Sequence, residues 1–321
     1  MLFEFDIVFI ASASVMALVL DKLLGEPKRF HPLVGFARWA QFWQNRLEKK
    51  HNKPLLPLAQ FVRGLICWLF AVSPWVVLSL LIVLIPWPWW FTWSVSVLLL
   101  YLAIGQKSLA EHAQAVYQPL VETADLTQAR HALSMIVSRD TNTLNEQQIT
   151  SATVETVLEN THDAVIGPLF WFCVLGAPGV VLFRLANTLD AMWGYRTSRY
   201  EFFGKTAARM DDLLGYLSAR VTVLLFALKS PRAFRAAWIF GRKWYSPNAG
   251  PVMAGGAGAL NLCLGGRAPY GGQEKSRPYL YDGQPAKGDD IVRAIRLMHF
   301  ASSAWLVLLC AVLLTVRILG E

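Results

Sequence analysis

Residues 62–104 have the sequence VRGLICWLFAVSPWVVLSLLIVLIPWPWWFTWSVSVLLLYLAI, and this stretch decides the fold class. Positions 62–85 are apolar over a length that crosses the hydrocarbon core of a bilayer as a helix, and 91–104 supply a second apolar run. Between them, PWPWW at 86–90 combines helix-breaking prolines with tryptophans of the kind that gather at membrane interfaces. The stretch predicts a helical membrane hairpin with a very short outer turn.

The composition of the whole chain indicates a membrane protein. Of its 321 residues, 55% are hydrophobic and only 16% are charged, against about 25% charged residues in soluble domains. The net charge of +8 is typical of basic loops that fix membrane topology. Because there is no basic stripe with interleaved aromatic residues and no zinc spacing, nucleic acid is not an expected partner. The four cysteines lack a CxxC pattern and are expected to be small buried hydrophobes.

The remaining apolar runs are 7–20, 164–183, 213–228 and 300–318. The first lacks the basic region and cleavage site of a signal peptide, and the last is a clean span. In contrast, 164–183 is interrupted by prolines and glycines, and 213–228 contains Arg220. Broken backbone at membrane depth is tolerated only inside protein or beside water. We therefore expect these two runs to be re-entrant or buried in the bundle.

The expected fold is all-α: a polytopic helical membrane protein that forms a single membrane-embedded domain over 1–321. It has about four full crossings, with both termini outside, plus re-entrant or buried helices and cytoplasmic helical loops. A six-crossing arrangement would leave the basic stretch 184–212 outside, against the positive-inside rule. The cell inner membrane is the expected location, with the active face cytoplasmic. The polar segments assigned to the cytoplasm are 22–60, 105–162, 184–212 and 229–299.

A carboxylate face is predicted where the polar segment 105–162 enters the next apolar run. Glu155, Glu159 and Asp163 recur at i, i+4 and i+8, which places them on one side of a helix. Carboxylates at that spacing repel one another, so they should be compensated by Arg and Lys side chains or by a metal ion. A solvated acidic face is the alternative. The direct passage into AVIGPLFW favours a functional face.

The segment 184–212, RLANTLDAMWGYRTSRYEFFGKTAARMDD, supplies the counter-charges as two helical patterns on either side of Gly194. Carboxylate and amide oxygens suit a hard cation such as Mg²⁺, and Arg and Lys suit phosphate oxygens. Their mixture predicts a phosphate group held through Mg²⁺ at the membrane surface. A self-neutralising cluster of salt bridges between helices is the alternative. The side chains concerned are Arg184, Asn187 and Asp190 before the break, and Lys205, Arg209, Asp211 and Asp212 after it.

Two further segments combine turn-forming residues with polar side chains. LDKLLGEPKRFHPLVG at 20–35 places His31 at a membrane edge, with prolines fixing a rigid turn. SPNAGPVMAGGAGALNLCLGGRAPYGG at 246–272 has a turn at Asn248 and then small residues that let backbones approach closely. Neither segment contains a P-loop or a dinucleotide fingerprint.

Seven segments occur in order over nearly the whole chain: LDKLLGEPKRFHPLVG (20–35), SRDT (138–141), ETVLENTHDAVIGPLFW (155–171), RLANTLDAMWGYR (184–196), FGKTAARMDD (203–212), PNAGPVMAGGAGAL (247–260) and LGG with Tyr270 (264–270). In these segments the chain resembles the adenosylcobinamide-phosphate synthase family, integral membrane enzymes of cobalamin biosynthesis. The sequence departs from the family pattern at Glu26, where Asp is expected, and at Gly215 and Ser218, where Asn and Pro are expected.

The resemblance implies a carbon–nitrogen ligase. Aminopropanol phosphate, or a similar amino-alcohol phosphate, is joined to the free propionate of adenosylcobyric acid, a corrinoid, to give adenosylcobinamide phosphate. ATP is the co-substrate and Mg²⁺ the cofactor. Beside the lipid bilayer, other membrane enzymes of late cobamide assembly are candidate partners. A carboxylate is activated most simply as an acyl phosphate, and such a transfer needs positioning and charge neutralisation.

The polar residues of the matching segments are assigned three roles. The catalytic candidates are Glu159, Asp163, Asp190 and Arg209. The candidates for binding phosphate or substrate are Arg139, Arg184, Asn187, Arg196, Lys205, His31, Asn248 and Tyr270. The candidate metal ligands are Glu159, Asp163, Asp190, Asp211 and Asp212.

Three other functions remain as alternatives. A membrane alcohol-phosphotransferase or prenyltransferase also binds diphosphates through Asp-rich motifs, although AARMDD at 207–212 lacks the further paired aspartates of those enzymes. A non-catalytic membrane sensor on the same fold would keep its function when Asp163 or Asp212 loses its charge. A transporter is disfavoured because the two halves of the sequence do not repeat.

Overall fold

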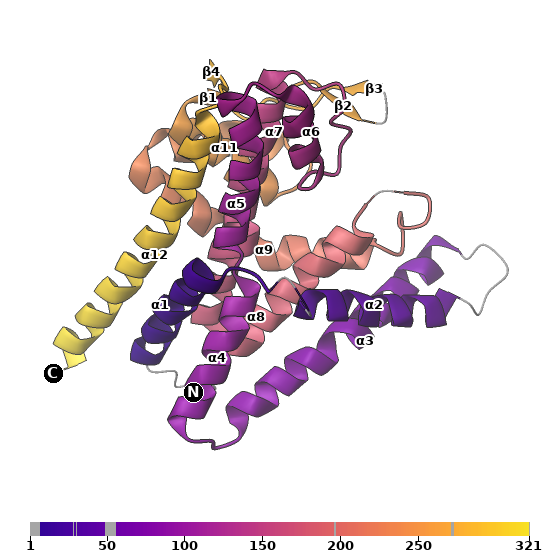
Figure 1. The fold of residues 1–321 in the computed structure, drawn as a ribbon. Coiled ribbons are helices and arrows are strands. Elements are labelled where there is room, and N and C mark those ends of the chain that lie inside the picture. The colour runs from indigo at the N-terminus through magenta and orange to yellow at the C-terminus, as the bar shows by residue number, and fades with distance from the viewer. Residues whose placement is uncertain are drawn as a thin grey trace. The chain divides into compact units, whose positions relative to one another are not determined.

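The structure is a computed structural model, and it describes residues 7–27, 29, 31–48, 56–195, 197–270 and 273–320. The side chains of 48, 268–270, 273–275, 313 and 317–320 are not described. Within the described part the chain is mostly helical (Figure 1), with two short strand pairs. The predicted fold class is confirmed: the protein is an all-α polytopic membrane protein.

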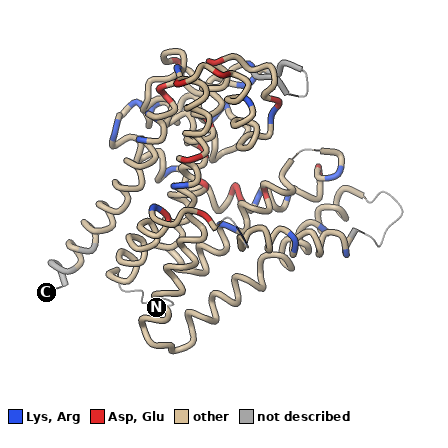
Figure 2. Tube along the Cα trace, viewed as in Figure 1, with Lys and Arg blue, Asp and Glu red and all other residues tan. Residues whose placement is uncertain are grey.

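Five helical stretches of the described residues are long and apolar enough to cross a membrane: Ile7–Leu24, Pro57–Leu84, Trp89–Glu122, Glu146–Trp193 and Asp290–Val316. Figure 2 shows the longest uncharged part of the chain, since no Lys, Arg, Asp or Glu occurs from residue 64 to residue 106. This part holds the predicted hairpin. Helix α3 (Pro57–Leu84) and helix α4 (Trp89–Ala103) are separated only by residues 85–88.

The first compact unit consists of Met1–Ile104 and Gly167–Gly215. Helix α8 (Gly167–Trp193) packs against the other helices of this unit, which are α1 (Ile7–Leu24), α2 (Pro32–Glu48), α3 and α4. Its non-helical backbone at Gly176, with φ 63° and ψ −151°, lies two residues before Pro178. A larger share of its candidate span is buried than of any of the other four. A broken but internal helix is what the sequence predicts for residues 164–183.

The core of this first unit joins aromatic and aliphatic side chains of α2, α3 and α8 with Phe203. Cys67 is fully buried within it, as expected, whereas Cys310 of the final helix is exposed. Close approach of the backbone requires glycine at position 64 of α3, because a Cβ there would overlap the carbonyl group of Phe203. Glycine therefore lets α3 lie directly against the segment that follows α8.

The second compact unit consists of Gly105–Ile166 and Tyr216–Glu321. Helix α12 (Asp290–Gly320) packs on α5, α7 and α11, and α10 packs on α11. Strands β1 and β4 pair in parallel over two residues each, and β2 and β3 pair in antiparallel orientation. The remaining elements of the unit are α5 (Gln106–Tyr117), η1 (Gln118–Glu122), α6 (Leu126–Ser134), α7 (Glu146–Thr161), η2 (His162–Ile166), α10 (Arg232–Ile239), η3 (Gly241–Lys243), α11 (Ala249–Leu260), β1 (Leu262–Cys263), β2 (Ala268–Tyr270), β3 (Gln273–Lys275) and β4 (Gln284–Pro285).

Helix α9 (Lys205–Lys229) begins in the first unit and ends in the second. It is not among the candidate spans, which agrees with the prediction that 213–228 does not cross by itself. Each unit contains candidate spans. The expectation of one membrane-embedded domain over 1–321 stays a prediction.

Topology can be tested at Arg199, an exposed residue between α8 and α9. With four crossings this residue faces the cytoplasm. An Arg199→Cys variant without the exposed Cys310 should therefore resist a membrane-impermeant maleimide in intact cells and react after permeabilisation. Trp87→Cys, in the turn between α3 and α4, is the matched control and should react from outside. External labelling at residue 199 would overturn the four-crossing arrangement.

Candidate active site

The most deeply buried carboxylate of the second unit is that of Glu155 on α7. Arg277 donates two hydrogen bonds to it, of 2.8 and 3.1 Å, and Arg139 donates a third at 3.0 Å. The backbone N–H of Gly265 donates to the same carboxylate at 2.9 Å. The side chain of Glu155 is 3% exposed, and those of Arg139 and Arg277 are 12% and 8% exposed. Of the three carboxylates of the predicted face, Glu155 is thus compensated by arginines.

A polar cavity of about 540 Å³ opens beside this ion pair. Its wall contains both arginines, Glu155, the half-buried Glu159, and hydroxyl and amide groups of α7. The guanidinium carbon of Arg277 lies 5.4 Å from the ring centre of Trp244, which also lines the cavity. The space therefore offers positive, negative and neutral polar groups to one small ligand. The other polar lining residues are Ser138, Thr156, Asn160 and Tyr245.

Asp163 does not continue the α7 face, because α7 ends at Thr161 and residues 162–166 form the π-helix η2. His162 Nδ1 lies 2.6 Å from Asp163 Oδ1, and His162 Nε2 lies 2.8 Å from Ser218 Oγ on α9. A carboxylate can only accept, so in a neutral ring Nδ1 carries the hydrogen and Nε2 accepts from the serine. π-Helical turns of this kind are frequent at functional sites. Ser218, one of the positions at which the sequence departs from the family pattern, supplies the hydroxyl that orients this ring.

In the first unit, the two helical patterns of the segment 184–212 meet. The side-chain amide of Asn187 on α8 donates to Asp211 Oδ1 on α9 at 3.3 Å. Helix α8 ends at Trp193 and α9 begins at Lys205, so the predicted break at Gly194 is confirmed. Partial burial raises the pKa of the Asp212 carboxyl above its ordinary value, and the nearby Arg209 opposes that rise.

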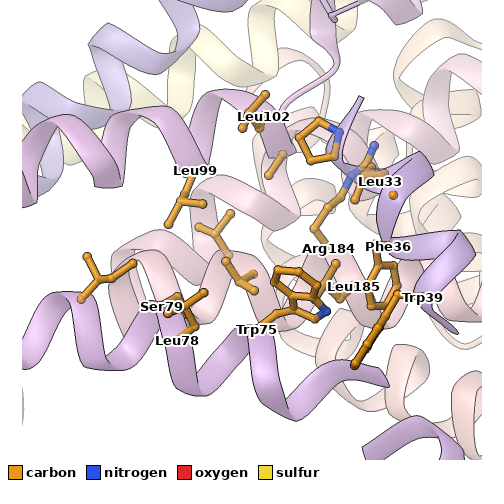
Figure 3. Close-up of a pocket in the computed structure, with 16 residues that line it drawn as sticks. Leu33, Phe36, Trp39, Trp75, Leu78, Ser79, Leu99, Leu102, Arg184 and Leu185 are labelled. Carbon is orange, nitrogen blue, oxygen red and sulfur yellow. The ribbon is translucent and has the colours of Figure 1, made fainter. Parts of the chain in front are cut away.

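The basic residues of this segment occupy different environments. Lys205 and Arg209 are exposed, and Lys205 Nζ lies 4.6 Å from the ring centre of Phe202. Arg184 is half-buried and lines an apolar cavity of about 660 Å³ together with residues such as Phe36 and Trp75. Figure 3 shows its side chain between Leu33 and Leu185 at one end of that cavity. Arg209 therefore has solvent access for an anion, and Arg184 has an apolar neighbourhood.

The other predicted binding residues are distant from one another in the sequence, and those that the structure describes make separate contacts. His31 accepts from the backbone N–H of Leu33 at 3.2 Å, just before α2. Asn248 is buried, and its side-chain oxygen accepts from Arg220 at 3.2 Å. Arg196 and the side chain of Tyr270 lie outside the described residues.

The candidate metal ligands divide between the units: Asp190, Asp211 and Asp212 belong to the first, and Glu159 and Asp163 to the second. Among the described residues, no group of three or more His, Cys, Asp or Glu side chains is gathered as a metal centre. Mg²⁺ usually takes only one or two carboxylates and fills its octahedron with water and substrate phosphates. Asp211 and Asp212 follow one another on α9 and carry oxygen donors of the kind that such an ion prefers.

A family model described as CobD/Cbib protein matches residues 14–298. The chain belongs to the CobD/Cbib family. The Chromobacterium violaceum protein named "Cobalamin biosynthesis protein CobD" is 48% identical over 307 residues, covering 90% of this chain and 92% of that protein. The Salmonella typhimurium protein named "Cobalamin biosynthesis protein CbiB" is 38% identical over 310 residues, covering 92% and 95%. No solved structure matches.

Two residues of this CobD/Cbib family member were missed by the sequence reasoning. Arg277 lies in a loop rich in Gly, Pro and Tyr, where a basic residue is normally solvated, and only the fold brings it to Glu155. His162 precedes the assigned Asp163, but a lone histidine at the edge of an apolar run gives no signal of its own. The predicted pairing of acidic and basic residues was the one available clue to Arg277.

Asp212 gives a pH prediction for this CobD/Cbib family member. Because its folded pKa is raised, its contribution to stability is fully present below its ordinary pKa of 3.8 and is lost as pH rises through the folded value. Asp212→Asn should therefore flatten the fall in melting temperature across that window and should not lower stability at neutral pH. Thermal unfolding in detergent at stepped pH measures this. A steeper fall in the variant would contradict the assignment.

Proposed function

We propose that this CobD/Cbib family member acts in cobalamin biosynthesis as an ATP-dependent carbon–nitrogen ligase. It joins an amino-alcohol phosphate to the free propionate of adenosylcobyric acid and releases adenosylcobinamide phosphate. The observation that carries the proposal is the mixed-charge cavity beside Glu155. An amino-alcohol phosphate is a small zwitterion, with an anionic phosphate at one end and an ammonium group at the other.

The cavity suits such a zwitterion by its charges. Arg139 and Arg277 supply guanidinium groups of the kind that bind phosphate oxygens. Glu159, half-buried on the same wall, supplies a carboxylate for the ammonium end. The ion pair with Glu155 fixes both guanidinium groups before any ligand arrives, which lowers the ordering cost of binding.

The reaction conserves atoms and charge through an acyl phosphate. The propionate oxygen takes the γ-phosphoryl group of ATP and ADP leaves. The amine lone pair then attacks the acyl carbon, inorganic phosphate leaves, and the surplus proton passes to a carboxylate or to water. Glu159, Asp163 and Asp190 are the proposed acceptors. Asp163 is oriented for this by His162.

The segment 184–212 is proposed to serve the triphosphate. Asp211 and Asp212 would hold Mg²⁺ together with Asp190, and the ion would neutralise phosphate charge during phosphoryl transfer. Arg184, Lys205 and Arg209 are the proposed phosphate contacts, with Asn187 holding Asp211. Glu159 and Asp163 complete the predicted ligand set.

A reconstituted assay tests the proposed reaction. Purified protein receives adenosylcobyric acid, aminopropanol phosphate, ATP and Mg²⁺, and the product mass and the ADP formed are measured. An amide product with one ADP per turnover is expected. A phosphodiester product would support the phosphotransferase alternative, and no turnover with intact corrinoid binding would support the sensor. Within this assay, Glu159→Gln should raise KM for the amino-alcohol phosphate more than KM for ATP.

The metal assignment has its own prediction. Amide substitutions at Glu159, Asp163, Asp190, Asp211 and Asp212 should raise the Mg²⁺ concentration needed for half-maximal activity, or abolish activity, while elution in size-exclusion chromatography stays unchanged. An ion prefers the charged form of Asp212, so Mg²⁺ affinity should also increase with pH. Normal Mg²⁺ dependence in all five variants would rule the assignment out.

A further inference from the structure

The end of α9 and the whole of α10 carry an unbalanced charge. From residue 229 to residue 245 the sequence is KSPRAFRAAWIFGRKWY, which contains five Lys or Arg residues and no Asp or Glu. Every one of the five is exposed. Neither the proposed reaction nor the ion pairs described above use these residues. Because these side chains are exposed, their charge is available to an anionic ligand from outside the chain.

Helix α10 has two different sides. Ala233, Ala236 and Ala237 are buried where the helix packs on α11. The packing is close, since a Cβ on Gly258 of α11 would lie 2.6 Å from the Cβ of Ala236. On the outer side, Phe234 and Trp238 are 56% and 59% exposed. A rigidly held helix thus presents large aromatic side chains outward.

The outward side is ordered as two rows. Phe234 and Trp238 stand one turn apart and form an aromatic row, and Arg232 and Arg235 form a basic row beside it. The guanidinium carbon of Arg242 lies 3.2 Å from the ring centre of Trp238, so a further cation sits against the aromatic row. We call the outward side chains of Arg232, Phe234, Arg235, Trp238 and Arg242 the α10 surface.

A contact with α12 gives the level of this surface relative to a membrane. Lys229, three residues before α10, has its Nζ 5.5 Å from the ring centre of Phe300. Phe300 lies near the start of the part of α12 that contains no Lys, Arg, Asp or Glu, which runs from Leu297 to Val316 within a candidate span. The start of α10 therefore lies where α12 passes from polar to apolar residues. Aromatic and basic side chains at that level are characteristic of the membrane interface.

We propose that the α10 surface is a binding site for anionic phospholipid headgroups. The guanidinium groups of the basic row contact lipid phosphates, and the aromatic row inserts at the boundary between headgroups and acyl chains. Membrane-surface attraction contributes about 1 kcal/mol, or about fivefold in binding, for each basic residue. Together with α12, the α10 surface would fix the orientation of the second unit relative to a negatively charged leaflet.

Site-specific photocrosslinking identifies what covers the surface. Benzoylphenylalanine is introduced at Phe234 in the full-length protein, which is illuminated in native membranes and analysed by intact mass. A phospholipid adduct is expected. Gln147, exposed in the first turn of α7, is the control position and should give no lipid adduct. Capture of another protein at residue 234, or no adduct there, would overturn the proposal.

Charge is tested separately by lipid competition. The protein is placed in nanodiscs of mixed phosphatidylglycerol and phosphatidylcholine, and the lipids that remain bound are counted by native mass spectrometry. Arg235→Gln should lower the preference for phosphatidylglycerol about fivefold, and Arg232→Gln with Arg235→Gln about 25-fold. Lys287→Gln, which removes an exposed charge of the same unit that is not part of the α10 surface, should leave the preference unchanged. Equal losses in Arg235→Gln and Lys287→Gln would show a general charge effect and no lipid site at α10.

Discussion

Glu155→Gln is expected to destabilise the second unit by about 3–5 kcal/mol, because it removes the negative partner of two arginines that stay largely buried. Glutamine keeps the size of the side chain and can still accept one hydrogen bond. It cannot compensate two guanidinium charges. We expect a marked fall in melting temperature in detergent, measured by cysteine-reactive dye fluorescence, and a loss of the monodisperse peak in size-exclusion chromatography.

Glu111→Gln is the matched control for this substitution. Glu111 also lies on a helix and also pairs with a basic residue, but Lys107 is 3.9 Å away and both side chains are substantially exposed. Surface pairs of this type contribute about 1 kcal/mol or less. The melting temperature should therefore fall much further in Glu155→Gln than in Glu111→Gln. Equal melting temperatures for Glu155→Gln and wild type would mean that solvent reaches the ion pair and that it does not hold α7 to the loop carrying Arg277.

Arg209→Ala is expected to weaken binding of a phosphate-bearing substrate roughly ten- to hundredfold, which corresponds to about 1.5–3 kcal/mol for a charge-assisted contact. Arg209 is exposed on the first turns of α9, close to Asp211 and Asp212, so its guanidinium can reach a ligand held there. If the contact is a bidentate fork, Arg209→Lys should lose nearly as much affinity as Arg209→Ala. Equilibrium binding of ATP and of aminopropanol phosphate measures both variants.

Arg199→Ala provides the comparison within the same segment. Arg199 is exposed as well, and its guanidinium lies 5.3 Å from the ring centre of Tyr200. It carries no assigned role, so its removal should leave both affinities near the wild-type values. Unchanged affinities in Arg209→Ala would reduce Arg209 to a structural residue that moderates the charge of Asp212.

The helices were predictable wherever one strong physical signal acted. The predicted apolar runs 62–85 and 91–104 match the ends of α3 and α4 within two residues, except that α3 begins five residues earlier, at Pro57. The glycine at 194 marks the end of α8. The charged spacing from Lys205 onward gave the start of α9. These signals are local in sequence, because backbone hydrogen bonds within a helix connect near neighbours.

The arrangement of the site was less predictable because its contacts are not local. Three carboxylates at helical spacing suggested one continuous face, but the π-helix at 162–166 changes the register, and Asp163 turns to His162. The sequence predicts that Glu155 needs a cation, yet its main partner lies 122 residues away in a loop. The convergence of the candidate metal ligands also depends on distant segments, and it stays a prediction.

The same sequence separation has a consequence during synthesis on the ribosome. Each unit is built from two pieces of chain, so the first unit gains α8 only after residues 105–166 have been made. Glu155 emerges 16 residues after Arg139 but 122 residues before Arg277. At translation rates of about 5–20 residues per second, that interval is on the order of 10 s. Of the two arginines that pair with Glu155, Arg139 is thus the one already made when the carboxylate emerges, and the site is complete only after Arg277 has been added.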